Sequence, residues 1–162
     1  MLDYVPGRRD YPAKQRMSLK IDLKPGEKFI VNGAVLKAGK RRVSLMLENE
    51  AILLRSKDIM QETEANTPAR RIYFSLMLLY ISGGDQEARK RFDAYLNDFL
   101  GVTSLREVRA ALLDILRHVE NSKIYLAMKT CKWLIEVEEK LLKIAMNRKN
   151  GEIASPTIQE SP

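Results

Sequence analysis

Hydrophobic and polar residues alternate over the first patterned part of the chain. From Met17 to Leu23 every second residue is apolar, which is typical of a half-buried β-strand. Pro25-Gly26 marks a turn, and Asn32-Gly33 between two short apolar segments is a strong signal for a two-residue hairpin. We therefore predict an antiparallel β meander of four or five strands over residues 17–57.

After this region the apolar residues recur with the period of an α-helix. Thr67-Pro68 predicts the start of a helix that runs to about Ser82, because Thr suits the N-cap and Pro the first helical position. Further apolar stripes predict a bundle of about four helices over residues 58–147, so the fold class is α+β. Residues 1–16 and 148–162 have no periodicity, and we interpret them as a flexible basic arm and a disordered tail.

Size and composition restrict the class of protein. The 162 residues are enough for one domain or two small ones, and 45% are hydrophobic. A β region of about 40 residues is too small to bury its own core comfortably, so we expect it to pack on the helices or on another chain, for example in a homo-oligomer. No apolar run reaches the ~18–20 residues that span a bilayer, and we expect no membrane partner.

The cysteine content and the N-terminal residues predict a cytoplasmic protein. Cys131 is the one cysteine, so no internal disulfide can form, which fits a reducing compartment. Cys131 lies among apolar residues in a helical pattern, which favours a buried, inert thiol. The first residues lack the apolar segment of a secretory signal.

Positive charge is concentrated in the N-terminal part of the chain. The net charge is +7, and residues 1–60 hold 13 Lys and Arg against 7 Asp and Glu. A basic half of this kind indicates a polyanionic partner such as nucleic acid. Simple solubility explains the same charge, and the two interpretations remain open at this point.

The sequence contains no recognisable catalytic motif. His118 is the single histidine, and it has no Cys or His at a metal-binding spacing. No glycine-rich phosphate loop is present, and the helical aspartates have no spacing that suggests an acid–base pair. We therefore predict that the protein is not an enzyme and that it needs no cofactor or metal.

A first group of basic residues follows the predicted strands. Exposed Lys and Arg on a sheet can contact phosphates, and Arg can stack on an unpaired base. The alternative is that these cations only protect exposed sheet edges from pairing with other chains. Phe29 is the one aromatic residue between Met17 and Ile72, so a base-stacking platform is poorly supported. The candidate residues are Lys37, Lys40, Arg41, Arg42, Arg55 and Lys57.

A second basic feature, Arg70-Arg71, lies in the first turn of the helix that begins near Pro68. A helix N-terminus carries partial positive charge, so cations there are unfavourable by roughly 0.3–1 kcal/mol each. Either an acid of the chain neutralises them, such as Glu62, Glu64 or one on a neighbouring helix, or they hold an external phosphate or carboxylate. The pattern leaves both alternatives open.

Three segments together resemble the FlbT family of bacterial flagellum biosynthesis regulators. They are LKPGEKFIVNGAVL, LLRSKDIMQ and TPARRIYF, which occur here in the family's order and spacing. The resemblance runs from about Met17 to about Ile144 and therefore covers most of the chain.

The resemblance implies a cytoplasmic, non-enzymatic regulator of flagellin production. Members of the family are described as associating with the 5′ untranslated leader of a flagellin messenger and promoting its degradation, and some members act in the opposite direction, as activators. The family also works with a second small flagellar protein, FlaF, and with flagellin itself. An adaptor or chaperone that acts on flagellin or FlaF without contacting RNA is therefore the alternative function.

A shorter likeness connects AILLRSKDI with the small dimeric β-fold of the carbon-storage regulator family. Those proteins bind leader RNA through an arginine at the end of their last strand, which points to Arg55 here. If the ligand is a leader RNA, Arg41, Arg42, Arg55 and Lys57 become candidate phosphate contacts. Arg70-Arg71 would then be a second seat for phosphate.

Overall fold

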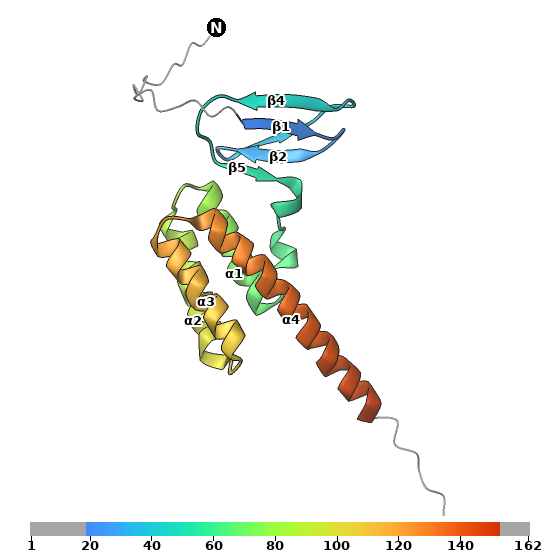
Figure 1. Cartoon of the computed structure of the whole chain (residues 1–162), viewed down its shortest axis with the longest axis vertical. Coiled ribbons are helices and arrows are strands. Elements are labelled where there is room, and N and C mark those ends of the chain that lie inside the picture. The colour runs from blue at the N-terminus through green and yellow to red at the C-terminus, as the bar shows by residue number, and fades with distance from the viewer. Residues whose placement is uncertain (1–18, 153–162) are drawn as a thin grey trace, which may run out of the picture. The chain divides into compact units, whose positions relative to one another are not determined.

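The computed structural model describes residues 19–152, and the chain divides into two compact units between Ser56 and Lys57. We call these the β unit and the helical unit (Figure 1). Strands occupy the first and α-helices the second, which confirms the predicted α+β class. The predicted arm, residues 1–16, and residues 153–162 of the predicted tail lie outside the described residues.

All described strands of the β unit pair antiparallel. One sheet contains β1 and β4, and the other has the order β3-β2-β5. Only β2 and β3 are both neighbours in sequence and hydrogen-bonded partners among the described strands, so the pairing is not that of a simple meander. The strands are β1 (Leu19–Leu23), β2 (Lys28–Val31), β3 (Ala34–Lys37), β4 (Val43–Leu47) and β5 (Leu53–Arg55).

The predicted hairpin at Asn32-Gly33 is confirmed. Both residues have positive φ, 48° and 82°, as a type I′ turn requires, and they join β2 to β3. The backbone N–H of Asn32 also donates to the carbonyl of Ile52 at 2.9 Å, and its side-chain oxygen accepts from the Ile52 N–H at 2.9 Å. Asn32 therefore both makes the turn and aligns the chain entering β5.

The two sheets of the β unit share one small hydrophobic core. Ile21 and Leu23 of β1 pack with Phe29 of β2 and with Ala38, and none of the four is more than 7% exposed. The alternation predicted for β1 is visible at its C-terminal end, where Ile21 and Leu23 are buried and Asp22 between them is exposed, whereas Leu19 is 52% exposed although it is apolar. Partly buried side chains extend this core: Val31, Leu47 and Leu53.

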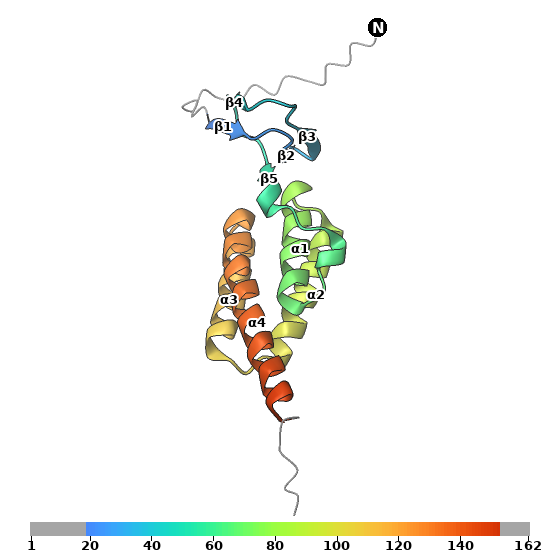
Figure 2. The ribbon, with the colours of Figure 1, turned by 90° about the vertical axis from the view of Figure 1, so that its right-hand side faces the viewer.

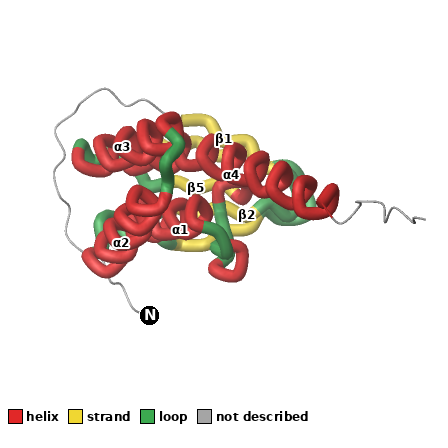
Figure 3. The backbone as a smooth tube through the Cα atoms, turned by 90° about the horizontal axis from the view of Figure 1, so that it is seen from below, coloured by secondary structure: helices red, strands yellow, loops and turns green. Residues whose placement is uncertain are grey.

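In the described part of the chain, two short 3-10 turns, the first of which begins at the boundary between the units, and four α-helices follow the β unit. Helix α1 packs against both α2 and α4, and α3 packs against α4, as Figure 2 and Figure 3 show from two directions. The helices are α1 (Pro68–Ile81), α2 (Gln86–Val102), α3 (Arg106–Glu120) and α4 (Ile124–Glu152), and the turns are η1 (Ser56–Asp58) and η2 (Glu62–Glu64).

Helix α1 starts and ends as its sequence predicts. Thr67 is the N-cap, and its hydroxyl oxygen accepts the N–H of Arg70 at 3.4 Å. Ile72 and Leu76 are fully buried, as expected for the most apolar helix of the bundle. Cys131 of α4 is also fully buried with its Sγ 3.4 Å from the Ala69 carbonyl, and burial raises the pKa of this thiol.

A buried carboxylate anchors the first turn of the helical unit. Asp58 is 6% exposed and pairs with the ammonium of Lys132 on α4. The hydroxyl of Tyr73 on α1 donates to the Asp58 carbonyl at 2.8 Å. Burial raises the pKa of Tyr73 well above its usual range, and the neighbouring Asp58 charge adds to this shift. The η1 turn is therefore attached to two helices at once.

Helix α4 is longer than predicted. The predicted bundle ended at residue 147, but α4 continues to Glu152, so residues 148–152 are helical and not part of a disordered tail. No proline occurs between Ile144 and Glu152 to stop the helix, the glycine of α4 is its second-last residue, Gly151, and cations such as Arg148 are favourable near a helix C-terminus.

Candidate nucleic-acid interface

Four of the predicted cations lie within six residues at the end of β3 and in the loop to β4. Lys37 is the last residue of β3, and Lys40, Arg41 and Arg42 form the loop that precedes Val43. All four are exposed, and none belongs to an ion pair among the described residues. We call this segment the cationic loop.

The strand register adds a cation that sequence reasoning missed. Lys28 of β2 lies directly opposite Lys37 of β3, so the two side chains share one side of the sheet. Both are exposed, and like charges at directly opposed positions are destabilising. A bound anion would remove that repulsion. The hairpin at Asn32-Gly33 was the available signal, because counting back equal distances from it pairs these two lysines.

One carboxylate lies near this positive charge. Asp22 of β1 accepts a hydrogen bond from the Ser44 hydroxyl, and this bond is the main reason why its pKa is lowered. The charges of Lys20, Arg42 and Arg55 lower the pKa of Asp22 further. Asp22 therefore remains ionised at neutral pH and offsets part of the positive field.

Arg55 is held inside the β unit. Its Nη2 donates to the Glu27 carboxylate at 3.0 Å and to the Asp22 carbonyl at 3.1 Å, while its Nε is buried with no hydrogen-bond partner. The Lys24 N–H and then Arg55 lower the pKa of Glu27. The positive charge of Arg55 is therefore paired with Glu27, and its hydrogen bonds link β5 to the β1–β2 turn. Its side chain is 39% exposed.

Lys57 belongs to the helical unit and not to the β unit. Its side chain is exposed, and its carbonyl accepts from the Lys132 ammonium at 3.3 Å. The structure therefore does not bring Lys57 together with the cationic loop in one unit.

Carboxylates of α4 neutralise the start of α1. The Ala69 N–H donates to Glu138 at 3.1 Å, and the Thr67 hydroxyl donates to the second oxygen of the same carboxylate. The Arg70 guanidinium pairs with Glu139 at 2.8 Å. Of the two alternatives for this helix end, the structure thus supplies an internal partner for Arg70, an acid on a neighbouring helix.

Arg71 differs from its neighbour. Its side chain is exposed and makes no ion pair among the described residues. The N–H groups and hydroxyl that an external phosphate would use beside it are occupied by Glu138. Arg71 is therefore a single exposed cation, and it does not form a preformed anion-binding site together with Arg70.

Sequence reasoning did not identify Glu138 and Glu139. A signal existed, since Glu138 follows the buried residues Cys131 and Leu134 at helical spacing and so occupies a core-facing position of α4. An acid at such a position indicates a buried partner. Only the tertiary structure showed that the partner of Glu138 is the N-terminus of α1.

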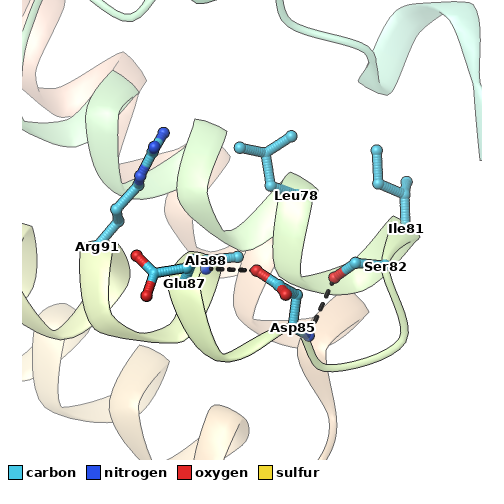
Figure 4. Close-up of a pocket in the computed structure, with 7 residues that line it drawn as sticks. All are labelled: Leu78, Ile81, Ser82, Asp85, Glu87, Ala88 and Arg91. Atoms are coloured by element: carbon cyan, nitrogen blue, oxygen red, sulfur yellow. Dashed lines mark hydrogen bonds between the residues drawn. The ribbon is translucent and has the colours of Figure 1, made fainter.

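The remaining described surface offers no assembled chemistry. No group of three His, Cys, Asp or Glu side chains in residues 19–152 could hold a metal ion, and His118 only faces Asp114 at 3.4 Å. Figure 4 shows a shallow hollow where α1 meets α2, with Leu78, Ile81 and Ala88 among its lining residues. Its polar groups are used by the turn, because Asp85 caps the Ala88 N–H at 3.0 Å. No helix in the described part of the chain is long and apolar enough to cross a membrane.

Fold and surface together define a two-unit α+β protein whose candidate site is a set of exposed cations on its β unit. The chain belongs to the FlbT family: the family described as flagellar protein FlbT matches residues 19–142. The segments that carried the resemblance thus led to the correct family.

The matches between this chain and its curated relatives cover most of the length of each relative. The chain is 45% identical over 127 residues to the probable flagellum biosynthesis repressor protein FlbT of Caulobacter sp. (strain K31), covering 78% of this chain and 97% of that protein. It is 43% identical over 127 residues to the flagellum biosynthesis repressor protein FlbT of Caulobacter vibrioides (strain ATCC 19089 / CIP 103742 / CB 15), covering 78% and 90%. The corresponding protein of Agrobacterium fabrum is 31% identical over 146 residues, covering 90% and 93%. No solved structure matches the chain.

Proposed function

We propose that this protein is a cytoplasmic post-transcriptional regulator of flagellin synthesis that binds the 5′ untranslated leader of a flagellin messenger and promotes its degradation. Membership of the FlbT family and the names of its relatives, flagellum biosynthesis repressor proteins, support a repressing role in flagellar synthesis. The observation that carries direct RNA contact is the cationic loop. A transcript is the polyanion that repression after transcription requires.

The cationic loop suits phosphate contacts for a physical reason. None of its four cations forms an ion pair among the described residues, although the charge of Arg42 acts on Asp22, so no internal ion pair must break before they bind. Arg supplies a planar fork of donors that matches two phosphate oxygens, and Arg41 and Arg42 provide two such forks at consecutive positions of the chain. We place the main phosphate contacts at Lys37, Lys40, Arg41 and Arg42, with Lys28 beside them.

The other predicted cations have lesser roles in this proposal. Arg55 and Arg70 are each paired with a carboxylate of the chain, so each would have to break its ion pair before it could bind RNA. Lys57 and Arg71 are exposed on the helical unit and would add only long-range attraction.

Salt-dependent binding tests the proposal. Phosphate contacts release counterions, and on single-stranded RNA each contact adds about 0.7 to the slope of log affinity against log salt. We expect the full chain to bind the flagellin leader with a steep salt dependence. The Arg41→Ala/Arg42→Ala variant should lower that slope by about 1.4 and weaken binding at low salt.

A matched control removes the same charge elsewhere. Arg106 and Lys123 are exposed on the helical unit and make no ion pair among the described residues, so Arg106→Ala/Lys123→Ala should leave the slope nearly unchanged. Salt-independent binding of the leader, or equal losses in the two double variants, would rule out the cationic loop as the contact surface.

A second candidate function is an adaptor that acts on flagellin or on FlaF. The observation that favours it is the apolar surface of α4, where Trp133 is 43% and Ile144 52% exposed. Purified flagellin and FlaF should then be retained on the immobilised protein after nuclease treatment. Loss of both partners on nuclease treatment would favour an RNA bridge instead.

A further inference from the structure

Helix α4 carries a line of apolar side chains on its outer side. Leu126, Trp133, Leu141 and Ile144 are 41–52% exposed, and Val137 between them is half-buried. We call these five residues the outer stripe. Successive intervals of seven, four, four and three residues keep them on one side of the helix. At 1.5 Å per residue the outer stripe is about 27 Å long.

The outer stripe is not needed by the fold of the helical unit. A different side of α4 packs on the bundle, where Ala127, Cys131 and Leu134 are fully buried. The C-terminal part of α4 extends beyond the other three helices (Figure 1). Residues 140–148 in this part are all exposed. A helix with one buried apolar side normally has polar residues opposite, so a second apolar line indicates a partner surface.

The charges beside the outer stripe specify the chemistry of that partner. Four exposed cations flank it, namely Lys129, Lys140, Lys143 and Arg148, and none of them forms an ion pair among the described residues. Glu136 is the exposed acid in this region, since the other two glutamates of the segment already bind α1. The complementary surface is therefore apolar with acidic edges.

We propose that the outer stripe docks an amphipathic helix of another protein whose apolar residues are flanked by Asp and Glu. A second copy of this chain is a poorer occupant, because pairing two α4 helices would bring the same four cations face to face. Trp133 and Val137 lie at the centre of the stripe, where a large aromatic side chain contributes most to helix recognition. This surface lies on the helical unit and is independent of RNA binding by the cationic loop.

Two synthetic peptides test the proposal on the full chain. Both contain three heptads with Leu at the 4-3 spacing and no Trp, and they differ only in having Glu or Lys at the flanking positions. Trp133 is the single tryptophan of the chain, so its emission reports directly on the centre of the stripe. We expect the Glu peptide to shift this emission to shorter wavelength with saturation and the Lys peptide to leave it unchanged.

Variants then locate the contact. Leu126→Ser and Ile144→Ser should each weaken Glu-peptide binding by about tenfold, equivalent to about 1.4 kcal/mol. The control Leu113→Ser changes a 54% exposed leucine on α3 and should bind normally. Far-UV circular dichroism confirms that each variant folds.

Three results would overturn the proposal. They are equal binding of the Glu and Lys peptides, absence of Glu-peptide binding up to about 1 mM, and an unliganded dimer that Leu126→Ser dissociates. The last result would assign the stripe to a second copy. None of these results bears on the proposed binding of the leader, because that proposal depends on the cationic loop of the β unit and not on α4.

Discussion

The ion-paired cations Lys132 and Arg70 of the helical unit and the cations of the cationic loop have different surroundings. Lys132 and Arg70 each meet a carboxylate, Asp58 and Glu139, within their own unit. The four cations of the cationic loop form no ion pair among the described residues, although the charge of Arg42 acts on the Asp22 carboxylate. Charge in a sequence therefore does not distinguish a structural cation from a binding one, because the distinction depends on which acids the fold brings near.

Removing Lys132 should have the largest effect on stability. Lys132→Met leaves the Asp58 carboxylate buried without its partner, and breaking a buried pair in this way typically costs 3–5 kcal/mol. Because 40% of the Lys132 side chain is exposed, we expect a loss of about 3 kcal/mol in the free energy of unfolding. Urea denaturation followed by circular dichroism measures it. The double variant Asp58→Asn/Lys132→Met should recover part of the loss, and no recovery would contradict a charge-based cause.

Removing Glu138 should have the next largest effect. Glu138→Ala leaves the Ala69 N–H and the Thr67 hydroxyl without their acceptor at the start of α1, next to the Arg70 charge. We expect a loss of about 2 kcal/mol in the free energy of unfolding, from the lost hydrogen bonds and from the lost anion at a helix N-terminus. Glu136→Ala, an exposed acid on the same helix, is the control and should change stability little. Equal losses would show that α4 charge, not capping, matters.

Acid should weaken the β unit through Glu27. The Lys24 N–H and the Arg55 charge lower the pKa of Glu27 in the folded state below its ordinary value of 4.5. The unfolded chain therefore binds the proton first, so this contribution to stability is present above pH 4.5 and is lost as the pH falls through the folded-state pKa. Amide NMR signals of β2 and β5 should report less acid dependence in Glu27→Gln. Glu48→Gln, at an exposed glutamate, should retain the wild-type dependence.

Changing the cationic loop should affect stability least. Arg41→Ala/Arg42→Ala removes two exposed side chains with no ion pair among the described residues, so the free energy of unfolding should change by no more than about 0.5 kcal/mol. Urea denaturation followed by circular dichroism measures it. This small effect sharpens the contrast with Lys132, because the same variant should weaken leader RNA binding. A large loss of stability would show that these arginines are structural.

Several features of this protein could be predicted from residues close together in the chain. The period-2 pattern located β1, Asn32-Gly33 located the hairpin, and Thr67-Pro68 located the start of α1. Three short continuous segments of the sequence also led to the FlbT family. These predictions succeed because strand alternation, positive φ angles and helix capping depend on the nearest neighbours in sequence.

The roles of the charged residues were decided by the tertiary structure. Arg55 and Arg70 looked like Arg41 and Arg42 in the sequence, but Glu27 and Glu139, 28 and 69 residues away, neutralise them. The pairing of β1 with β4 likewise joins strands that are separated by a complete hairpin. Ion pairs and strand order depend on which distant segments share a core, and the local periodicity of the chain contains no information about that choice.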